Sequence, residues 1–261
     1  MSTYLDGILD AHRAVAATDG RRTSDLVEQC RDLPPTRGFV DAIRSSNTLA
    51  VIAEVKRRSP SRGPLHADLD PAQVAASYEA GGASCVSVLT DGPHFGGSAE
   101  DLASARSAVS LPVLRKDFTV SANDVCDARL MGADCVLLIV AALSDGELEE
   151  FAAVAAEVSI DVLVEVHDEA ELARALRWAA PTMVGVNQRD LVTFEVDTAR
   201  AVRVAADMPD GVVRVAESGV RGRDDAVTLA GAGYHAVLVG EHLVTAADLT
   251  AATAALRVPR H

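Results

Sequence analysis

Two charged side chains stand in a segment that otherwise has the pattern of a buried strand. The stretch IAEVKRRSPSRGPL, residues 52–65, begins with apolar residues and then places Glu54 and Lys56 two positions apart. Residues i and i+2 of a strand point to the same face, so both charges enter one space. Either the two charges neutralise each other, or they face a bound molecule that is not protein.

Polar residues also end five other apolar runs, where a strand would stop. In chain order the polar groups of all six runs are Glu54, Lys56 and Ser59; Arg115, Lys116 and Asp117; Glu165 and His167; Asn187, Arg189 and Asp190; Glu217, Ser218 and Gly219; and Gly240, Glu241 and His242. A structural ion pair would explain any one pairing alone, but six ends together favour a functional site. Lysines and glutamates that face one cavity supply acids and bases, because burial and mutual charge move their pKa values apart.

Eight apolar runs, each followed by a segment with helical spacing, would position these groups. They begin at Leu49, Ser84, Leu111, Asp134, Ile160, Thr182, Gly211 and His235. Three helix-to-strand turns, AGGASC, MGADC and AGAGYHA, place glycine where a helix C-terminus needs positive φ. Eight such units predict a single α/β domain, a (β/α)8 TIM barrel, whose chemistry lies at the carboxyl ends of its strands. No glycine-rich nucleotide motif follows the first strand, which weakens an open doubly wound sheet.

Residues 1–48 precede the first strand and are predicted to form an N-terminal helical extension packed on the barrel domain, residues 49–261. Tyr4–Ala16 and Thr23–Arg31 are predicted as helices. The extension could cap the bottom of the barrel or form a lid or wall of the active site, and the sequence favours neither.

Charge and cysteine content limit the classes of binding partner and the compartment that we expect. The 24 basic and 38 acidic residues give a net charge of −14, and no long basic block argues for nucleic acid or an anionic membrane. The four cysteines form no Cys-x-x-Cys pair and are expected as buried thiols in a reducing cytosol. The first residues lack the apolar stretch of a signal peptide, so we expect a cytoplasmic protein. We expect a monomer, although the sequence leaves an oligomer open.

The loops after the seventh and eighth runs have the features of a phosphate site. They read ESGVRG and VGEHL, and this pair of strands usually holds the phosphate site of the barrel fold. Gly219 and Gly240 allow the backbone to approach an oxyanion, and the following N–H groups can donate to it. A phosphate would also explain lysines in the cavity of an acidic protein.

Six motifs resemble those of one enzyme family. EVKRRSPSRG, VLRKDF, LVEVHDEAEL, VGVNQRDL, VAESGV and AVLVGE are similar, in order, to the motifs of indole-3-glycerol phosphate synthase. The resemblance implies ring closure of 1-(2-carboxyphenylamino)-1-deoxyribulose 5-phosphate, with loss of CO₂ and water, in tryptophan biosynthesis. It implies a carboxy-lyase that uses no cofactor, and no histidine has the spacing of a metal ligand.

Residue roles follow from the same resemblance. Lys116 resembles the acid that protonates the ketose oxygen, and Lys56 resembles the partner of the substrate carboxylate, with a further proton role left open. Glu165 and Glu54 resemble the pair that handles dehydration, in an order the sequence does not give. Asn187 and Ser218 are further predicted catalytic residues, and Arg189 and Glu217 are predicted to bind substrate.

The remaining predicted contacts fall into two sets. The phosphate cradle comprises Ser59, Gly219, Gly240 and Glu241. The wall for the aromatic ring comprises Phe95, Phe118, Leu137, Ile139 and Leu191, although ordinary core packing explains apolar residues equally well. The chain departs from the usual family pattern at Arg62, Gln188 and His242, and we expect His242 to point outward.

Three rival functions stay open. A phosphoribosylanthranilate isomerase would be expected to use a cysteine base where this chain has Glu54 and Lys56. An aldolase that forms a Schiff base on Lys56 or Lys116 is a second rival. A catalytically silent phosphate-binding paralogue is the third. The presence of both lysines together with Glu54, Glu165 and Asn187 speaks against it.

Overall fold

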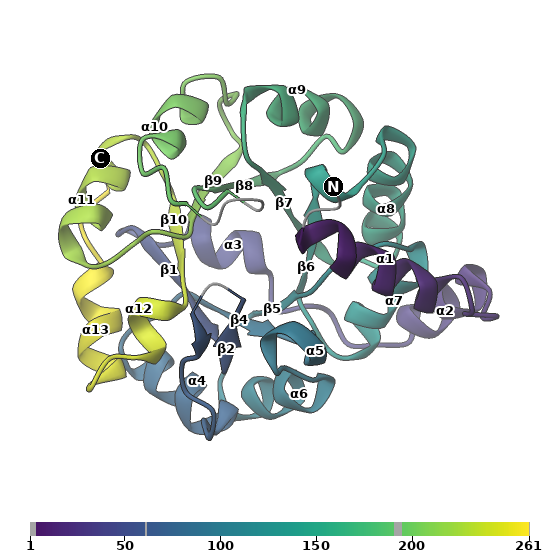
Figure 1. The fold of residues 1–261 in the computed structure, drawn as a ribbon, viewed down its shortest axis with the longest axis horizontal. Coiled ribbons are helices and arrows are strands. Elements are labelled where there is room, and N and C mark those ends of the chain that lie inside the picture. Colours follow the sequence, from purple (N-terminus) through teal and green to yellow (C-terminus); the bar gives the residue numbers. More distant parts are fainter. Residues whose placement is uncertain (1–3, 61, 191–194, 261) are drawn as a thin grey trace.

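Eight parallel strands form a closed barrel in the computed structural model, which describes residues 4–60, 62–190 and 195–260. Around the barrel the strands follow the order β1-β10-β9-β8-β7-β6-β5-β4 (Figure 1). Their bounds are Ala50–Val55 (β1), Cys85–Leu89 (β4), Val113–Lys116 (β5), Cys135–Ile139 (β6), Asp161–Val166 (β7), Met183–Asn187 (β8), Val213–Glu217 (β9) and Ala236–Val239 (β10). Each of the eight predicted runs contains one of these strands, and the predicted TIM barrel is confirmed.

Strand alternation explains where the glutamates lie. Ala50 and Ile52 of β1 belong to the cluster inside the barrel, whereas Val51 and Ala53 belong to the cluster between strands and helices. Glu54 continues the inward series of β1. Leu163 of β7 and Val215 of β9 also belong to the inner cluster, so the glutamate two residues beyond each of them faces inward at the carboxyl end of the barrel.

Helices cover the outside of the barrel. They are α4 Pro71–Ala80, α6 Ala99–Ala108, α7 Ala122–Leu130, α8 Asp145–Glu157, α9 Glu169–Trp178, α10 Arg200–Ala205, α11 Arg223–Gly231 and α13 Leu249–Leu256. Asp70, Ser98 and Ser144 cap three of them through side-chain oxygens. Gly82, Gly132 and Gly233 have positive φ at the three predicted helix-to-strand turns. None of the described helices is long and apolar enough to cross a membrane.

Short elements lie in the loops at the carboxyl ends of the strands. After β1 comes a hairpin of β2 Arg58–Ser59 and β3 Gly63–Pro64. The helix α5 Gly92–Phe95 follows β4, a 3₁₀ helix at Val140–Ala142 follows β6, and α12 Glu241–Val244 follows β10. These loops build the rim of the site.

The N-terminal segment contributes to both ends of the barrel. Its helices α1 Tyr4–Ala16 and α2 Thr23–Arg31 have the predicted bounds, and α3 Phe39–Arg44 was not predicted. Phe39 and Ile43 of α3 are fully buried in the inner cluster, and the Val40 N–H donates to Asp161 at the start of β7, so α3 closes the barrel at the end opposite the site. Figure 1 shows α3 within the ring of strands. His12 of α1 instead contacts residues that follow β4 and β5. The division into an extension and a barrel domain stays a prediction, since both share these cores.

All four cysteines are buried free thiols, as predicted. Cys85 and Cys135 lie inside the barrel, where burial raises the pKa of both thiols well above the ordinary value. Burial also raises the pKa of Cys126 to about 12. These thiols therefore pack as small apolar side chains.

Candidate active site

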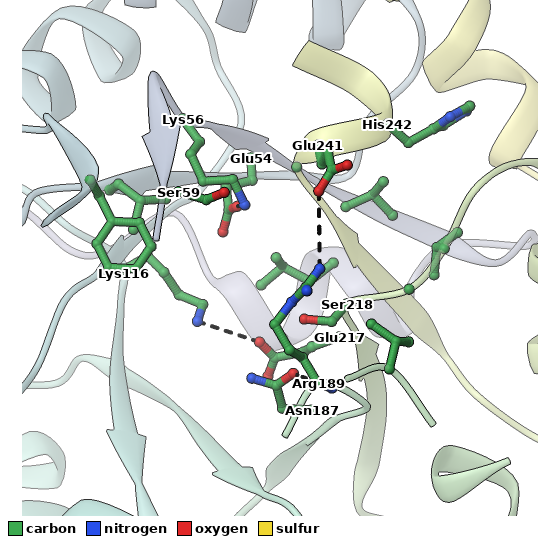
Figure 2. A pocket seen from close by; sticks show the side chains of 18 of the residues that line it. Glu54, Lys56, Ser59, Lys116, Asn187, Arg189, Glu217, Ser218, Glu241 and His242 are labelled. Carbon is green, nitrogen blue, oxygen red and sulfur yellow. Dashed lines mark hydrogen bonds and ion pairs between the residues drawn. The ribbon is translucent and has the colours of Figure 1, made fainter. Parts of the chain in front are cut away.

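A cavity of about 520 Å³ lies at the carboxyl ends of the barrel strands. It brings together all but one of the predicted catalytic and substrate-binding residues, and Figure 2 shows Glu54, Lys56, Lys116 and Glu217 around one space. Arg115, His167 and Asp190, which also end strands, do not line it. The predicted residues in its wall are Glu54, Lys56, Ser59, Phe95, Lys116, Phe118, Leu137, Ile139, Glu165, Asn187, Arg189, Glu217, Ser218, Gly219, Gly240 and Glu241. Leu191 lies outside the described residues.

Lys116 ends β5 and meets two carboxylates inside the cavity. Its Nζ lies 3.1 Å from Glu165 Oε2 and 3.6 Å from Glu217 Oε2. Burial lowers the pKa of Lys116, but the charges of Glu165, Glu217 and Glu54 together raise it above its ordinary value. The lysine is therefore a buried ammonium with a proton to donate.

Glu165 and Glu217 share this lysine, but their pKa values shift in opposite directions. Burial raises the pKa of Glu165, but Lys116, His167 and the Asn187 amide, which donates to Oε1 at 3.1 Å, lower it to about 2. Burial and the charge of Glu165 raise the pKa of Glu217 well above its ordinary value. Within the described residues Glu217 Oε1 has no hydrogen-bond partner. The pKa values of the two carboxyl groups are thus moved in opposite directions, as expected for two like charges that share a site.

A glycine makes room for the Glu217 carboxyl group. Gly185 of β8 lies so close that a Cβ there would overlap Glu217 Oε1. The strand sequence VGVN, which interrupts an apolar run with glycine, is the sequence signal for this close approach.

Glu54 and Lys56 face each other as well as the cavity. Lys56 Nζ lies 2.5 Å from Glu54 Oε1, and the two side chains are 16% and 6% exposed. A Cβ on Gly240 would overlap Glu54 Oε1 and would lie 2.8 Å from Lys56 Nζ. Both alternatives raised by the sequence therefore apply: the charges pair, and they also line a space that can hold a ligand.

The glycine loops after β9 and β10 lie beside these charges. Ser218 and Gly219 both have positive φ, 65° and 74°, and Gln188 Nε2 donates to the Ser218 carbonyl at 2.8 Å. This bond helps to hold a serine in a conformation that usually favours glycine. The unusual Gln188 thus acts on the shape of the loop.

Two arginines flank the same loops. Arg62 Nε lies 3.1 Å from Glu241 Oε1. Arg189 lies 4.0 Å from Glu241 Oε2, the pair that Figure 2 joins by a dashed line. Ser59 Oγ accepts from the backbone N–H of Arg62 at 3.3 Å. The His242 imidazole points away from the lysines and glutamates in Figure 2. Two arginines beside a glycine backbone make this end suited to an anion.

The opposite wall is apolar. Phe95 and Phe118 have ring centroids 6.2 Å apart with planes tilted by 41°. Leu137 and Ile139 of β6 belong to the inner cluster and also reach the cavity. The cavity therefore has a cationic end, an apolar end and proton-carrying groups between them.

Comparison with known proteins identifies the family. The family model described as indole-3-glycerol phosphate synthase matches residues 5–256. The chain belongs to the indole-3-glycerol phosphate synthase family. A protein of that name from Mycolicibacterium vanbaalenii is 49% identical over 98% of this chain and 94% of its own length. One from Rhodopirellula baltica is 45% identical over 97% of this chain and 98% of its own length. The predicted indole-3-glycerol phosphate synthase function in tryptophan biosynthesis is confirmed by these matches.

A solved structure of lower similarity supports the fold alone. Thiamine phosphate pyrophosphorylase from Pyrococcus furiosus aligns with a TM-score of 0.61 at 16% identity, over 80% of this chain and 94% of its own.

One cluster beside the site of this synthase-family chain was missed by sequence reasoning. His12 Nε2 lies 3.1 Å from Asp91 Oδ2 and 4.0 Å from Asp117 Oδ1, and the His12 ring packs 5.4 Å from Phe118. Asp91 also accepts from the backbone of α5, and Asp117 accepts from Arg115. These bonds give the carboxylates a structural use, so the cluster fastens α1 beside the aromatic wall. No sequence signal joins residues 79 positions apart.

Proposed function

We propose that this cavity closes, decarboxylates and dehydrates 1-(2-carboxyphenylamino)-1-deoxyribulose 5-phosphate, which makes the chain a carbon–carbon lyase of the carboxy-lyase class. The observation that carries the proposal is the buried Lys116 Nζ inside the cavity, 3.1 Å from the Glu165 carboxyl group and 3.6 Å from that of Glu217. The protein would act as a cytoplasmic monomer on a small phosphorylated substrate, without a cofactor or metal.

The cavity walls suggest how the substrate lies. The phosphate would meet the backbone at Gly219 and Gly240, together with Ser59 and the nearby arginines. The aromatic ring would pack against Phe95 and Phe118, and the carboxylate would face Lys56. Lys116 then lies between the two ends, where the ketose carbonyl must come.

Ring closure needs an acid at the carbonyl oxygen. The aryl carbon that bears the carboxylate attacks the carbonyl carbon, and the carbonyl π electrons move to oxygen. Lys116 donates a proton to that oxygen and becomes a neutral amine. The carboxylate then leaves as CO₂, and the electrons of its bond to the ring restore the aromatic system.

Dehydration uses Glu165 as the base and Lys56, which is paired with Glu54, as the acid. Glu165, ionised by its surroundings, takes a proton from the methylene group beside the nitrogen. Lys56, which no longer has the substrate carboxylate as partner, gives its proton to the departing hydroxyl while Glu54 lies 2.5 Å away. Glu165 can then return its proton to Lys116 across 3.1 Å. The protons balance, since converting a carboxylate into CO₂ and water consumes one proton.

The test is direct conversion of the substrate. Purified protein with the carboxyphenylamino-deoxyribulose phosphate should produce indole fluorescence and release CO₂ in equal amounts. Binding without either product would favour a silent paralogue. Borohydride-dependent attachment of substrate to Lys116 or Lys56 would favour Schiff-base chemistry, and turnover of phosphoribosylanthranilate instead would favour the isomerase.

A further inference from the structure

His167 follows β7 and connects the active site to the first turn of α9. Its Nδ1 lies 3.0 Å from Glu171 Oε2, and the same oxygen accepts from the His167 backbone N–H at 2.8 Å. Its Nε2 lies 3.6 Å from Glu165 Oε1. The side chain is 11% exposed, and within the described residues Nε2 has no hydrogen-bond partner. The steps proposed above do not use this imidazole.

The contact with Glu171 places a proton on one ring nitrogen. Glu171 Oε2 is an acceptor, so Nδ1 must carry a proton. A neutral ring would then turn the Nε2 lone pair toward the Glu165 carboxylate, whereas a charged ring turns an N–H toward it. Burial lowers the pKa of His167, but the bond to Glu171 and the charges of both glutamates raise it overall. The ring lies between two carboxylates, and these surroundings favour its imidazolium form.

We propose that His167 is a positioning residue that keeps Glu165 ionised and oriented while Lys116 is without its proton. Lys116 contacts Oε2 of Glu165, whereas His167 faces Oε1. When Lys116 gives its proton to the substrate, Glu165 loses its closest cation. A buried carboxylate without a cation takes up a proton and cannot act as a base. The imidazolium on the other oxygen prevents this.

The other charged groups near the ring do not take over this task. Asp168, Asp190, Arg200 and Arg203 line, with His167 and Glu171, a smaller cavity of about 310 Å³ on the outer side. Arg200 opposes the charge of His167 and donates to the Asn187 carbonyl at 3.2 Å. Arg203 pairs with Asp197 at 2.9 Å. Two groups therefore face Glu165 Oε1: the neutral Asn187 amide and the His167 ring. Of these two, only the ring can carry a positive charge.

The inference rests on the proposed roles of Lys116 and Glu165, and two variants test it. His167→Gln removes the charge, and Glu171→Gln keeps the ring but removes the group that holds its proton. Both variants should lower kcat with little change in KM. Once the pKa of Glu165 exceeds the pH of the assay, each further unit lowers the ionised fraction of Glu165, and with it kcat, roughly tenfold. The acid limb of the kcat profile should move to higher pH. Glu169→Gln, an exposed change in the same turn of α9, is the matched control and should leave the profile unchanged.

The NMR titration of the imidazole separates this inference from the proposed function. The His167 signal, assigned by its loss in His167→Gln, should titrate above 6.5 in the wild-type protein and at lower pH in Glu165→Gln and Glu171→Gln. Absence of turnover in the wild-type protein would count against the proposed function. The titration would still report the charge of His167, because it does not depend on turnover. Wild-type turnover with an unshifted acid limb in Glu171→Gln would overturn the inference, even if His167→Gln failed to fold.

Discussion

Replacing Lys116 with methionine tests the centre of the proposed mechanism. The change keeps much of the volume of the side chain but removes the ammonium that lies 3.1 Å from Glu165 and 3.6 Å from Glu217. Arg115 cannot substitute, because its guanidinium is bonded to Asp117 on the other face of β5. Ring closure should fall by about 10²–10³, or roughly 3–4 kcal/mol of transition-state stabilisation.

The same change should weaken the fold in a pH-dependent way. The pKa of Glu165 is about 2 in the folded protein against an ordinary value of 4.5. A lowered folded pKa adds stability that is present above pH 4.5 and is lost as the pH falls toward 2. The difference corresponds to about 3 kcal/mol, an upper limit for Lys116 because His167 and Asn187 contribute. Lys116→Met should therefore be less stable than wild type at pH 7, and the gap should narrow in acid.

The assay follows CO₂ from substrate labelled in its carboxylate, with indole fluorescence in parallel. Lys116→Met should release neither product at an appreciable rate. Lys116→Arg is the matched variant, because it retains the charge and the stability but lacks a proton that it can give up. Decarboxylation at the wild-type rate in Lys116→Met would refute the reasoning, and the acid would then have to be Lys56.

Three further outcomes are expected. Glu165→Gln should fold but lose roughly 10²-fold or more in kcat, because the amide cannot accept the proton; unchanged turnover would make Glu165 only a structural partner of Lys116. Gly240→Ala should lower both kcat and the affinity for inorganic phosphate, because the added Cβ meets Glu54 and Lys56. Gly146→Ala, with open space around it, should change neither quantity. Equal behaviour of the two variants would contradict this prediction. The bond to Asp91 raises the pKa of His12, so this contact adds stability below pH 6.5 and loses it as the pH rises through the folded pKa. Amide exchange in α1 should therefore accelerate with rising pH beyond the intrinsic rate, and His12→Gln should exchange faster at pH 6 without this extra dependence; identical profiles would disprove the docking role.

The repeating pattern of the sequence was enough to predict the barrel. Apolar runs of strand length at regular spacing, with glycine at the helix C-termini, leave few alternatives to a closed parallel sheet. Once the sheet is closed, strand alternation alone sends Glu54, Glu165 and Glu217 inward at the same end. These inward positions could therefore be predicted from local period and chain order, whereas the aromatic wall and the roles of the individual residues were predicted from the resemblance to the family.

The pairing of those residues was decided by the tertiary structure. The approach of both Glu165 and Glu217 to Lys116 depends on distances between different strands, and so do the opposite directions of their pKa shifts. The short helix α3 and the contact of His12 with Asp91 were missed for the same reason, since neither leaves a periodic trace in the chain. Local patterns determine which face a side chain joins. Electrostatic interactions act through space, so the charge of each group follows only from the neighbours that the closed barrel brings to it.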